Sequence, residues 1–240
     1  MRIDILTLHP QMCEGPIGES MLGRARERGV IDIGVHDIRA HGHGKHRIVD
    51  DAPYGGGSGM VMRVDVVDAA IEAVRSASVH VVLMDPAGTP FDQRAAKRLA
   101  QKEHLIFVCG HYEGVDARVR EHIADETLSI GDFVLTGGEL PALVCVDAVA
   151  RLIPEVLGNP DSLLEESFEE GRLSAPSYTR PANYQDWQVP EVLLSGHHEK
   201  IQQWRRQEAV RLTRLIRPDL DSSMSEAAEV AAVGESKPAS

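Results

Sequence analysis

The chain has 240 residues, of which 42% are hydrophobic and 26% charged, and its formal net charge is −12. These values suit a soluble protein with one large domain, or a large and a small one, around a real core. The acidic excess argues against indiscriminate binding of nucleic acid, DNA included, although it is compatible with a local basic face. No run reaches the roughly 18 apolar residues of a membrane span, and Asp4 interrupts any apolar signal region, so we expect a cytoplasmic protein without a membrane partner.

The first third of the chain predicts a strand, a helix and a second strand. Residues 2–8 alternate as a strand does, and residues 18–28 read as a short helix that ends at Gly29. Residues 30–38 place Val30, Ile33, Val35 and Ile38 among polar neighbours, which indicates another strand.

Residues 39–63 form a long polar segment without a helical or strand period. Such a loop inside a compact domain is usually functional or disordered. Its first half, HGHGKHR at 41–47, is rich in histidine and basic residues, and its second half is rich in glycine. Histidine ligands for a metal are one interpretation, but a cationic loop that folds over a polyanion is the one we favour. The segment is not a P-loop, because the final Gly-Lys-Ser/Thr is absent.

The next stretch alternates helices with wholly apolar strands. Helices are predicted at 64–76 and 91–101, and strands at 79–84 and 104–109. This alternation is typical of an α/β fold, in which helices cover both faces of a parallel sheet. Ligands of such sheets bind at the carboxyl ends of the strands, and glycine turns follow three strand ends, at 85–88, 110–114 and 131–138. No Gly-x-Gly-x-x-Gly follows the first strand, which disfavours a dinucleotide site.

The third glycine turn leads into an apolar helix. Thr136 and Glu139 have the spacing of a capping box, and Pro141 suits the opening turn of a helix over 140–156. Unpaired amides at such a loop and helix start favour a nucleotide-like ligand. An ordinary strand-to-helix turn is the alternative, and the spacing by itself leaves both open.

Three scattered cysteines bear on the chemistry of the core. Cys109 and Cys145 sit in apolar runs, and Cys13 stands alone near the N-terminus. This distribution favours buried, reduced thiols over disulfides or zinc ligands.

The character of the sequence changes after Gly158. Residues 159–177 are polar, as linkers are, and residues 178–220 hold both tryptophans. A helix over 198–217 would place Ile201, Trp204, Leu212 and Leu215 on one face, and it carries six basic against two acidic residues, a net of +4. The charged face is either merely solvated or binds a polyanion. The tail 221–240 has few bulky apolar residues and is expected to be disordered.

Six motifs run in order along the chain. They are DDAPYGGGSGM at 50–60, GHYEGVD at 110–116, SIGDFVLTGGEL at 129–140, RLIPEVLG at 151–158, SYTRP at 177–181 and VPEVLLSG at 189–196. Together they resemble the bacterial tRNA (guanine-37-N1)-methyltransferase family, TrmD, of the knotted SPOUT class. The resemblance implies a trefoil-knotted S-adenosylmethionine domain over 1–160, a linker over 161–177 and a helical tRNA-binding domain over 178–220. It also implies a homodimer.

The resemblance further implies that three loops hold S-adenosylmethionine, largely by backbone. The residues concerned are Leu83, Met84, Pro86, Gly110, Glu113, Gly114, Ile130, Gly131, Asp132, Phe133, Val134, Leu135, Gly137 and Gly138. We expect that Val in place of Gly110 or Gly138 nearly abolishes cofactor binding while the protein still folds.

The implied substrate is a tRNA anticodon stem-loop, methylated at N1 of guanosine 37 where guanosine 36 precedes it. The residues that match the family's substrate contacts or lie in its substrate-side segments are Tyr54, Gly55, Gly56, Gly57, Gly59, Ser167, Arg180, Arg206 and Arg214. A Mg²⁺ requirement is also possible, but no metal-binding residue is assigned.

The implied catalytic residues include one departure from the family. Arg151 matches an arginine that would stabilise negative charge near O6 of the base. The family's general base is an Asp followed by Ser, whereas this chain has Glu165 and Glu166 before Ser167, and the count from Arg151 selects Glu166. A misplacement of about 1 Å can cost roughly a hundredfold in rate.

Smaller departures are Ser174 for an Asp in some relatives and Phe133 for a frequent Tyr. Two other interpretations therefore stay open. One is a ribose 2′-O-methylase of the same knotted class, and the other is an RNA-binding protein that keeps the fold without turnover.

Overall fold

The structure is a computed structural model that describes residues 1–158, 166–169 and 171–220. The chain forms two compact units, Met1–Gly158 and Asn159–Ser240, and each is considered by itself. The sequence predicts the end of the first domain at residue 160. The first part of the predicted linker and the whole of the predicted tail lie outside the described residues.

A five-stranded parallel sheet is the centre of the first unit. Side by side, its strands are β2 (Asp32–Asp37), β1 (Arg2–Thr7), β6 (His104–Cys109), β5 (Val79–Pro90) and β7 (Glu126–Ser129). The predicted α/β fold with a parallel sheet is confirmed. The trefoil knot stays a prediction.

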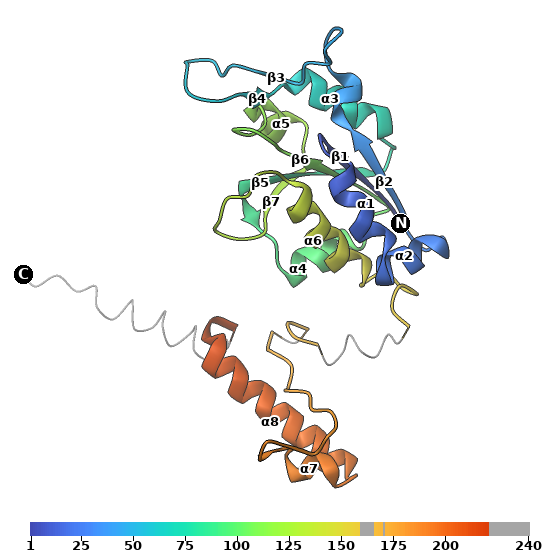
Figure 1. The fold of residues 1–240 in the computed structure, drawn as a ribbon, viewed down its shortest axis with the longest axis vertical. Coiled ribbons are helices and arrows are strands. Elements are labelled where there is room, and N and C mark those ends of the chain that lie inside the picture. Colours follow the sequence, from blue (N-terminus) through green and yellow to red (C-terminus); the bar gives the residue numbers. More distant parts are fainter. Residues whose placement is uncertain (159–165, 170, 221–240) are drawn as a thin grey trace, which may run out of the picture. The chain divides into compact units, whose positions relative to one another are not determined.

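Helices cover both faces of this sheet (Figure 1). One face carries α1 (Gln11–Gly18), α2 (Ser20–Glu27), α4 (Gln93–Leu99) and α6 (Glu139–Ala150). The other carries α3 (Val64–Val74), α5 (Ala117–His122) and the 3-10 turn η1 (Ile38–His41). Successive residues of a strand point to opposite faces of the sheet. Phe107 therefore packs in the core under α1, α2, α4 and α6, here called the first core, and Val108 packs in the second core, under α3, α5 and η1. This burial on both faces explains why β6 is apolar throughout after His104.

The helix predicted at residues 18–28 is α2, and a helix that was not predicted, α1, precedes it. The missed helix, α1, contains Gly15 and Pro16, which lower its intrinsic helix propensity. It forms nevertheless because Cys13 and Ile17 are buried in the first core. Packing of an apolar face stabilises a short helix more than propensity does.

Strand β5 continues past the turn predicted at 85–88. Met84 and Thr89 both pair with Leu128 of β7, so the residues between them bulge out of the sheet. Gly88 lies so close to Leu128 that an added Cβ would be 2.6 Å from its backbone. The turn is therefore a fixed bulge at the carboxyl end of the sheet.

The long polar loop 39–63 is mostly irregular, as predicted, but two short strands within it pair with each other. β3 (Asp50–Asp51) pairs antiparallel with β4 (Val61–Met62), and Met62 is fully buried. Met62 N–H donates to Gly114 O at 2.9 Å, and Glu113 N–H donates to Met60 O at 3.0 Å. The loop therefore returns along the second glycine turn.

The second unit begins with a hairpin, β8 (Asn183–Tyr184) and β9 (Trp187–Gln188). It continues with α7 (Glu191–Leu194), α8 (His198–Ile216) and the 3-10 turn η3 (Pro218–Leu220). The buried side of α8 is narrower than predicted, because Ala209 and Thr213 are buried whereas Leu215 is 69% exposed. The linker covers part of the buried side of α8, and Leu173 N–H donates to Thr213 Oγ1 there at 2.9 Å. Among the described residues, no helix is both long and apolar enough to cross a membrane.

A buried carboxylate joins side chains of β1, β2 and β6. Asp4 of β1 is 2% exposed. Its Oδ2 accepts from His104 Nε2 at 2.7 Å and from Arg2 Nε at 2.8 Å, and its Oδ1 contacts His36 Nε2 at 2.6 Å. A buried acid is tolerated here because each oxygen has a partner.

Replacing Asp4 with Ala should lower the free energy of unfolding by about 1–3 kcal/mol, because the buried imidazole of His104 would lose its acceptor. Urea unfolding followed by circular dichroism measures this change. Asp32→Ala, at an exposed position of β2, is the matched control and should change the value by less than about 0.5 kcal/mol. Equal stabilities of the two variants would contradict the role of Asp4.

Candidate functional site

A cavity of about 280 Å³ opens at the carboxyl ends of β5, β6 and β7. Its walls are the bulge after Met84 and the turns 110–114 and 129–138, which are the three glycine turns noted in the sequence. Loops from neighbouring parallel strands converge at this edge, which is where such sheets bind ligands. The predicted cofactor residues that line the cavity are Met84, Pro86, Gly110, Glu113, Gly114, Ile130, Gly131, Phe133, Val134, Leu135, Gly137 and Gly138.

Two predicted cofactor residues do not line the cavity. Leu83 is buried in the second core, on the face of the sheet that α3 covers. It points away from the face of its neighbour Met84, because successive strand residues point to opposite faces. Asp132 is exposed at the turn and also lies off the lining. The lining residues missing from the prediction are Asp85, Ala87, His111, Tyr112, Leu128, Ser129, Thr136 and Pro141. Most of them belong to the three predicted loops, so a prediction that included every residue of these loops would have found them.

Backbone contacts join two of the loops directly. Gly138 N–H donates to Gly110 O at 2.9 Å, and His111 forms an isolated antiparallel bridge with Gly137. A Cβ on Gly138 would lie 2.7 Å from Cys109 Cα and 2.9 Å from Gly110 N, closer than real Cβ atoms approach. The expectation that Gly138→Val leaves the fold intact is therefore wrong, since the side chain would push the two loops apart.

Gly114 marks open space within the cavity. Its φ is +128°, and a Cβ there would meet no atom within 4 Å. On the opposite turn, Val134 is 82% exposed and Leu135 39% exposed, although both are apolar. Open backbone beside apolar side chains suits a ligand with a flat apolar part and polar edges.

Glu139 does not cap the helix as the capping box predicted. Gly138 occupies the N-cap position of α6 without a side-chain hydrogen bond. Glu139 is 1% exposed, its Oε1 accepts from Thr7 Oγ1 at 2.6 Å, and its Oε2 has no partner among the described residues. Burial, aided by the nearby charge of Glu139, raises the pKa of the Cys13 thiol to about 11 and that of Cys109 well above its usual value. Both thiols are therefore protonated and unreactive at neutral pH.

The predicted catalytic residues belong to different units. α6 ends at Ala150, earlier than predicted, and Arg151 follows it, half-buried, with its N–H bonded to Asp147 O at 3.2 Å. Glu166 is half-buried in the second unit, where Ser167 and Ser174 share a hydrogen bond of 3.0 Å between their hydroxyls. The meeting of Arg151 and Glu166 at one base stays a prediction.

Apart from the half-buried Ser167, the predicted substrate residues lie on exposed surfaces. Tyr54 is fully exposed, and Gly55, Gly56, Gly57 and Gly59 after it all have positive φ, between 80° and 131°. These left-handed conformations explain the glycine run. Arg180, Arg206 and Arg214 are exposed in the second unit.

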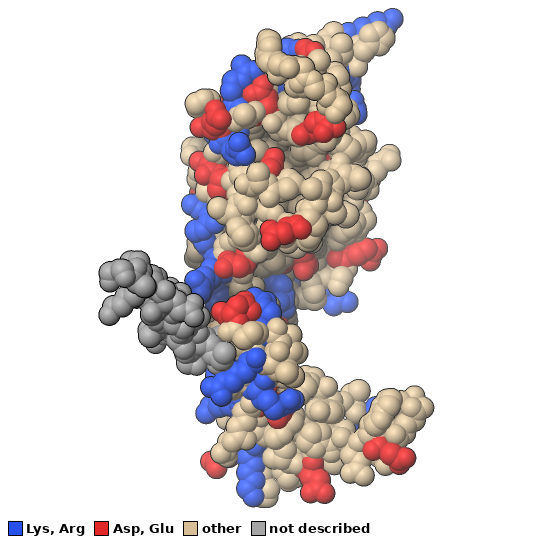
Figure 2. All heavy atoms as spheres, turned by 90° about the vertical axis from the view of Figure 1, so that its left-hand side faces the viewer, with Lys and Arg blue, Asp and Glu red and all other residues tan. Residues whose placement is uncertain are grey.

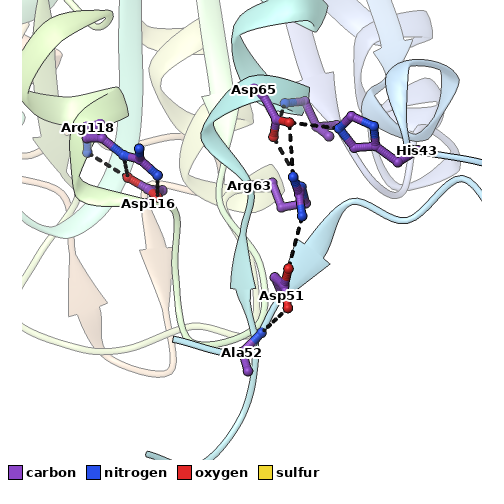
Figure 3. A network of polar contacts seen from close by, with 8 residues as sticks. His43, Asp51, Ala52, Arg63, Asp65, Asp116 and Arg118 are labelled. Atoms are coloured by element: carbon purple, nitrogen blue, oxygen red, sulfur yellow. Dashed lines mark hydrogen bonds and ion pairs between the residues drawn. The ribbon is translucent and has the colours of Figure 1, made fainter. Parts of the chain in front are cut away.

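A clamp of charged side chains holds the base of this glycine loop (Figure 3). Arg63 donates to Asp51 Oδ2 at 3.0 Å and to both carboxylate oxygens of Asp65 at 3.1 and 3.2 Å. His43 Nε2 lies 2.8 Å from Asp65 Oδ2. Hydrogen bonds from Arg63 first, and also from His43, lower the pKa of Asp65 to about 2. Asp65 therefore stays ionised at neutral pH, and the clamp fixes both stems of the loop.

Most of the chain matches one known family. Residues 1–223 match the family described as tRNA (Guanine-1)-methyltransferase TrmD. A protein of Geobacter sulfurreducens named tRNA (guanine-N(1)-)-methyltransferase is 55% identical over 222 residues, which cover 92% of this chain and 91% of that relative. Proteins of the same name from Dictyoglomus turgidum and Bacillus subtilis are each 51% identical, covering 92% of this chain and 89% and 92% of their own lengths. This chain, with its three glycine loops around one cavity, belongs to the tRNA (guanine-1)-methyltransferase TrmD family.

Proposed function

We propose that this protein moves a methyl group from S-adenosylmethionine to N1 of guanosine 37 in tRNA, in the cytoplasm. The observation that carries the proposal is the cavity of about 280 Å³ at three strand ends, which is built by the loops with the family's motifs. The name shared by the relatives, tRNA (guanine-N(1)-)-methyltransferase, supports the reaction and the substrate class.

The cavity suits S-adenosylmethionine in shape and in chemistry. Val134 and Leu135 offer apolar surface to a purine, and the backbone of the two turns offers donors and acceptors to its edge. Gly114 leaves room for close approach, and the Glu113 carboxylate on the same wall suits the cationic methionine part. When bound, S-adenosylmethionine supplies an electrophilic methyl group on its sulfonium.

The residues of the chain handle the proton and the charge of the base. Guanine N1 loses its proton as it forms the new bond to carbon, and we assign Glu166 as the general base that accepts this proton. Arg151 stabilises the negative charge that reaches O6 as the proton leaves. In our proposal both residues act on the same target base when tRNA is bound.

Contacts to tRNA are assigned to both units. Tyr54 is free to stack on an unpaired base at the edge of the glycine loop. Arg180, Arg206 and Arg214 offer guanidinium groups to phosphates, and Ser167 lies next to the general base. We expect anticodon stem-loops in which guanosine 36 precedes the target.

A homodimer is part of the proposal. α1 and α6 pack together and leave Met12, Leu140 and Val144 between 43% and 52% exposed. Leu140 and Val144 are one turn apart on α6, so these side chains form an apolar strip suited to a second copy of the chain. Sedimentation of the full chain measures this state.

The proposal assigns no residue to Mg²⁺. Among the described residues, no three His, Cys, Asp or Glu side chains gather as metal ligands. No step of the proposal runs through the ion.

Transfer of a labelled methyl group from S-adenosylmethionine to unmodified tRNA tests the function. We expect one label per tRNA, at N1 of guanosine 37. A label on a ribose 2′-oxygen would indicate the other kind of knotted methylase. Binding of both ligands without transfer would indicate an RNA-binding protein.

Ala87→Trp should weaken S-adenosylmethionine binding by at least about tenfold, because the ring would fill a cavity whose wall Ala87 already forms at an exposed position. Calorimetric titration measures the affinity. Ala77→Trp, an exposed alanine before β5 and off the lining, is the control and should bind normally. Normal binding by Ala87→Trp would place the cofactor elsewhere.

Glu166→Gln should leave both ligands bound but cut single-turnover methylation by at least about a hundredfold, because the amide cannot accept the N1 proton. Glu165→Gln, one residue away, is the matched control and should methylate normally. If Glu165→Gln is the inactive variant, the assignment is off by one residue. If both variants are active, the proton leaves by another route.

Changing Arg206 and Arg214 together to Glu should weaken tRNA binding and flatten its dependence on salt, because fewer phosphate counterions are released. Affinity for S-adenosylmethionine should not change. The same substitutions at Arg24 and Arg94, two exposed arginines of α2 and α4, are the control. Equal tRNA affinity of the two double variants would mean that the basic face of α8 is merely solvated.

A further inference from the structure

The histidine-rich part of the long loop is folded rather than irregular. Residues 41–48, here called the basic finger, form a tight turn closed by two backbone hydrogen bonds between His43 and Ile48, at 2.9 and 3.0 Å. Arg47 N–H donates to Gly44 O at 3.2 Å, and both residues have positive φ. In Figure 1 the finger belongs to the blue loop ahead of β3.

The finger is held in place at its base. His43 contacts Asp65 Oδ2 at 2.8 Å and so joins the charged clamp at the start of α3 (Figure 3). A Cβ on Gly42 would lie 2.5 Å from the backbone of Arg47, so the two sides of the turn touch. Val49, which follows the finger, is fully buried. These contacts present the tip in one orientation, which lowers the entropy lost on binding.

The tip of the finger carries uncompensated positive charge. Lys45 and Arg47 are exposed, no acidic residue occurs between positions 39 and 49, and the whole chain has a net charge of −12. Among the described residues, neither side chain has a hydrogen-bond or ion-pair partner. By contrast, the nearby Arg63 and Arg118 are both paired with carboxylates. Figure 2 shows Lys and Arg side chains at the top of the first unit.

The finger is separate from the cavity, to which it contributes no lining residue. It leaves the same stem as the glycine loop, because Arg63 N–H donates to Val49 O at 2.9 Å. The exposed Tyr54 and the cations of the finger therefore project from one fixed base. An exposed aromatic ring and unpartnered cations, carried on one stem, are groups that bind RNA through a base and through the phosphate backbone.

We propose that Lys45 and Arg47 of the basic finger bind phosphates of the tRNA backbone, as a contact in the first unit in addition to the basic helix α8. The proposal rests on tRNA being the substrate. It assigns to the clamp of Arg63, Asp65 and His43 the task of orienting the finger. The contact contributes affinity without reading sequence, because phosphates are the same in every tRNA.

The test is a full-length variant with Lys45→Gln and Arg47→Gln, whose tRNA affinity is measured between low and physiological salt. We expect roughly tenfold weaker binding at low salt, and a slope of log affinity against log salt that falls by about 2, about one for each lost phosphate contact. Affinity for S-adenosylmethionine and the unfolding midpoint should equal those of the unmodified protein.

Arg24→Gln with Arg94→Gln is the matched control, because it removes the same charge from exposed arginines on the helices of the other sheet face. A slope for the finger variant equal to that of this control would overturn the proposal. So would weaker binding with an unchanged slope, since phosphates would then not be involved. If the unmodified protein methylates tRNA while the finger variant binds it equally well, the finger proposal fails and the proposed function stands.

Discussion

The cavity depends on one close approach of backbone to backbone. Gly138 lies against Cys109 and Gly110, where a Cβ would be 2.7 Å from Cys109 Cα, and its N–H donates to Gly110 O. The turns that follow β6 and β7 therefore form one continuous wall, and α6 must begin at Glu139. A site built in this way is shaped before any ligand enters, which lowers the entropy lost on binding.

The two units differ in how much they bury. Among the described residues, Ala209 is the one buried apolar side chain of the second unit, whereas the first unit has two extensive cores. Tyr184 and Trp187 of the β8–β9 hairpin stay 57% and 70% exposed, with ring centroids 5.9 Å apart. The first unit thus provides a cavity with fixed walls, to which our proposal assigns the cofactor. The second offers basic and aromatic surface, which in our proposal becomes covered when tRNA docks.

Net charge is a poor guide to the partner of this protein. The chain carries −12, yet the proposed substrate is a polyanion. Many of its cations are neutralised within the fold, as when Arg98 donates to both oxygens of Glu126 at 2.8 and 2.7 Å. The groups that our proposal assigns to RNA are local: the tip of the basic finger and two exposed arginines of α8, Arg206 and Arg214. Because Debye screening limits exposed charges to about 10 Å, such local groups act without much regard to the total.

The sequence by itself determined the fold class, the three glycine turns and the family. Apolar strands such as β6 and the glycine motifs are local signals, and each can be read without its neighbours in space. Only the tertiary structure decided that α1 is helical despite Gly15 and Pro16, and that Glu139 bonds Thr7 instead of capping α6. It also decided that Leu83 belongs to the core on the α3 face of the sheet and not to the cavity. These outcomes depend on which surfaces meet when distant segments pack, and neither periodicity nor spacing along the chain encodes that geometry.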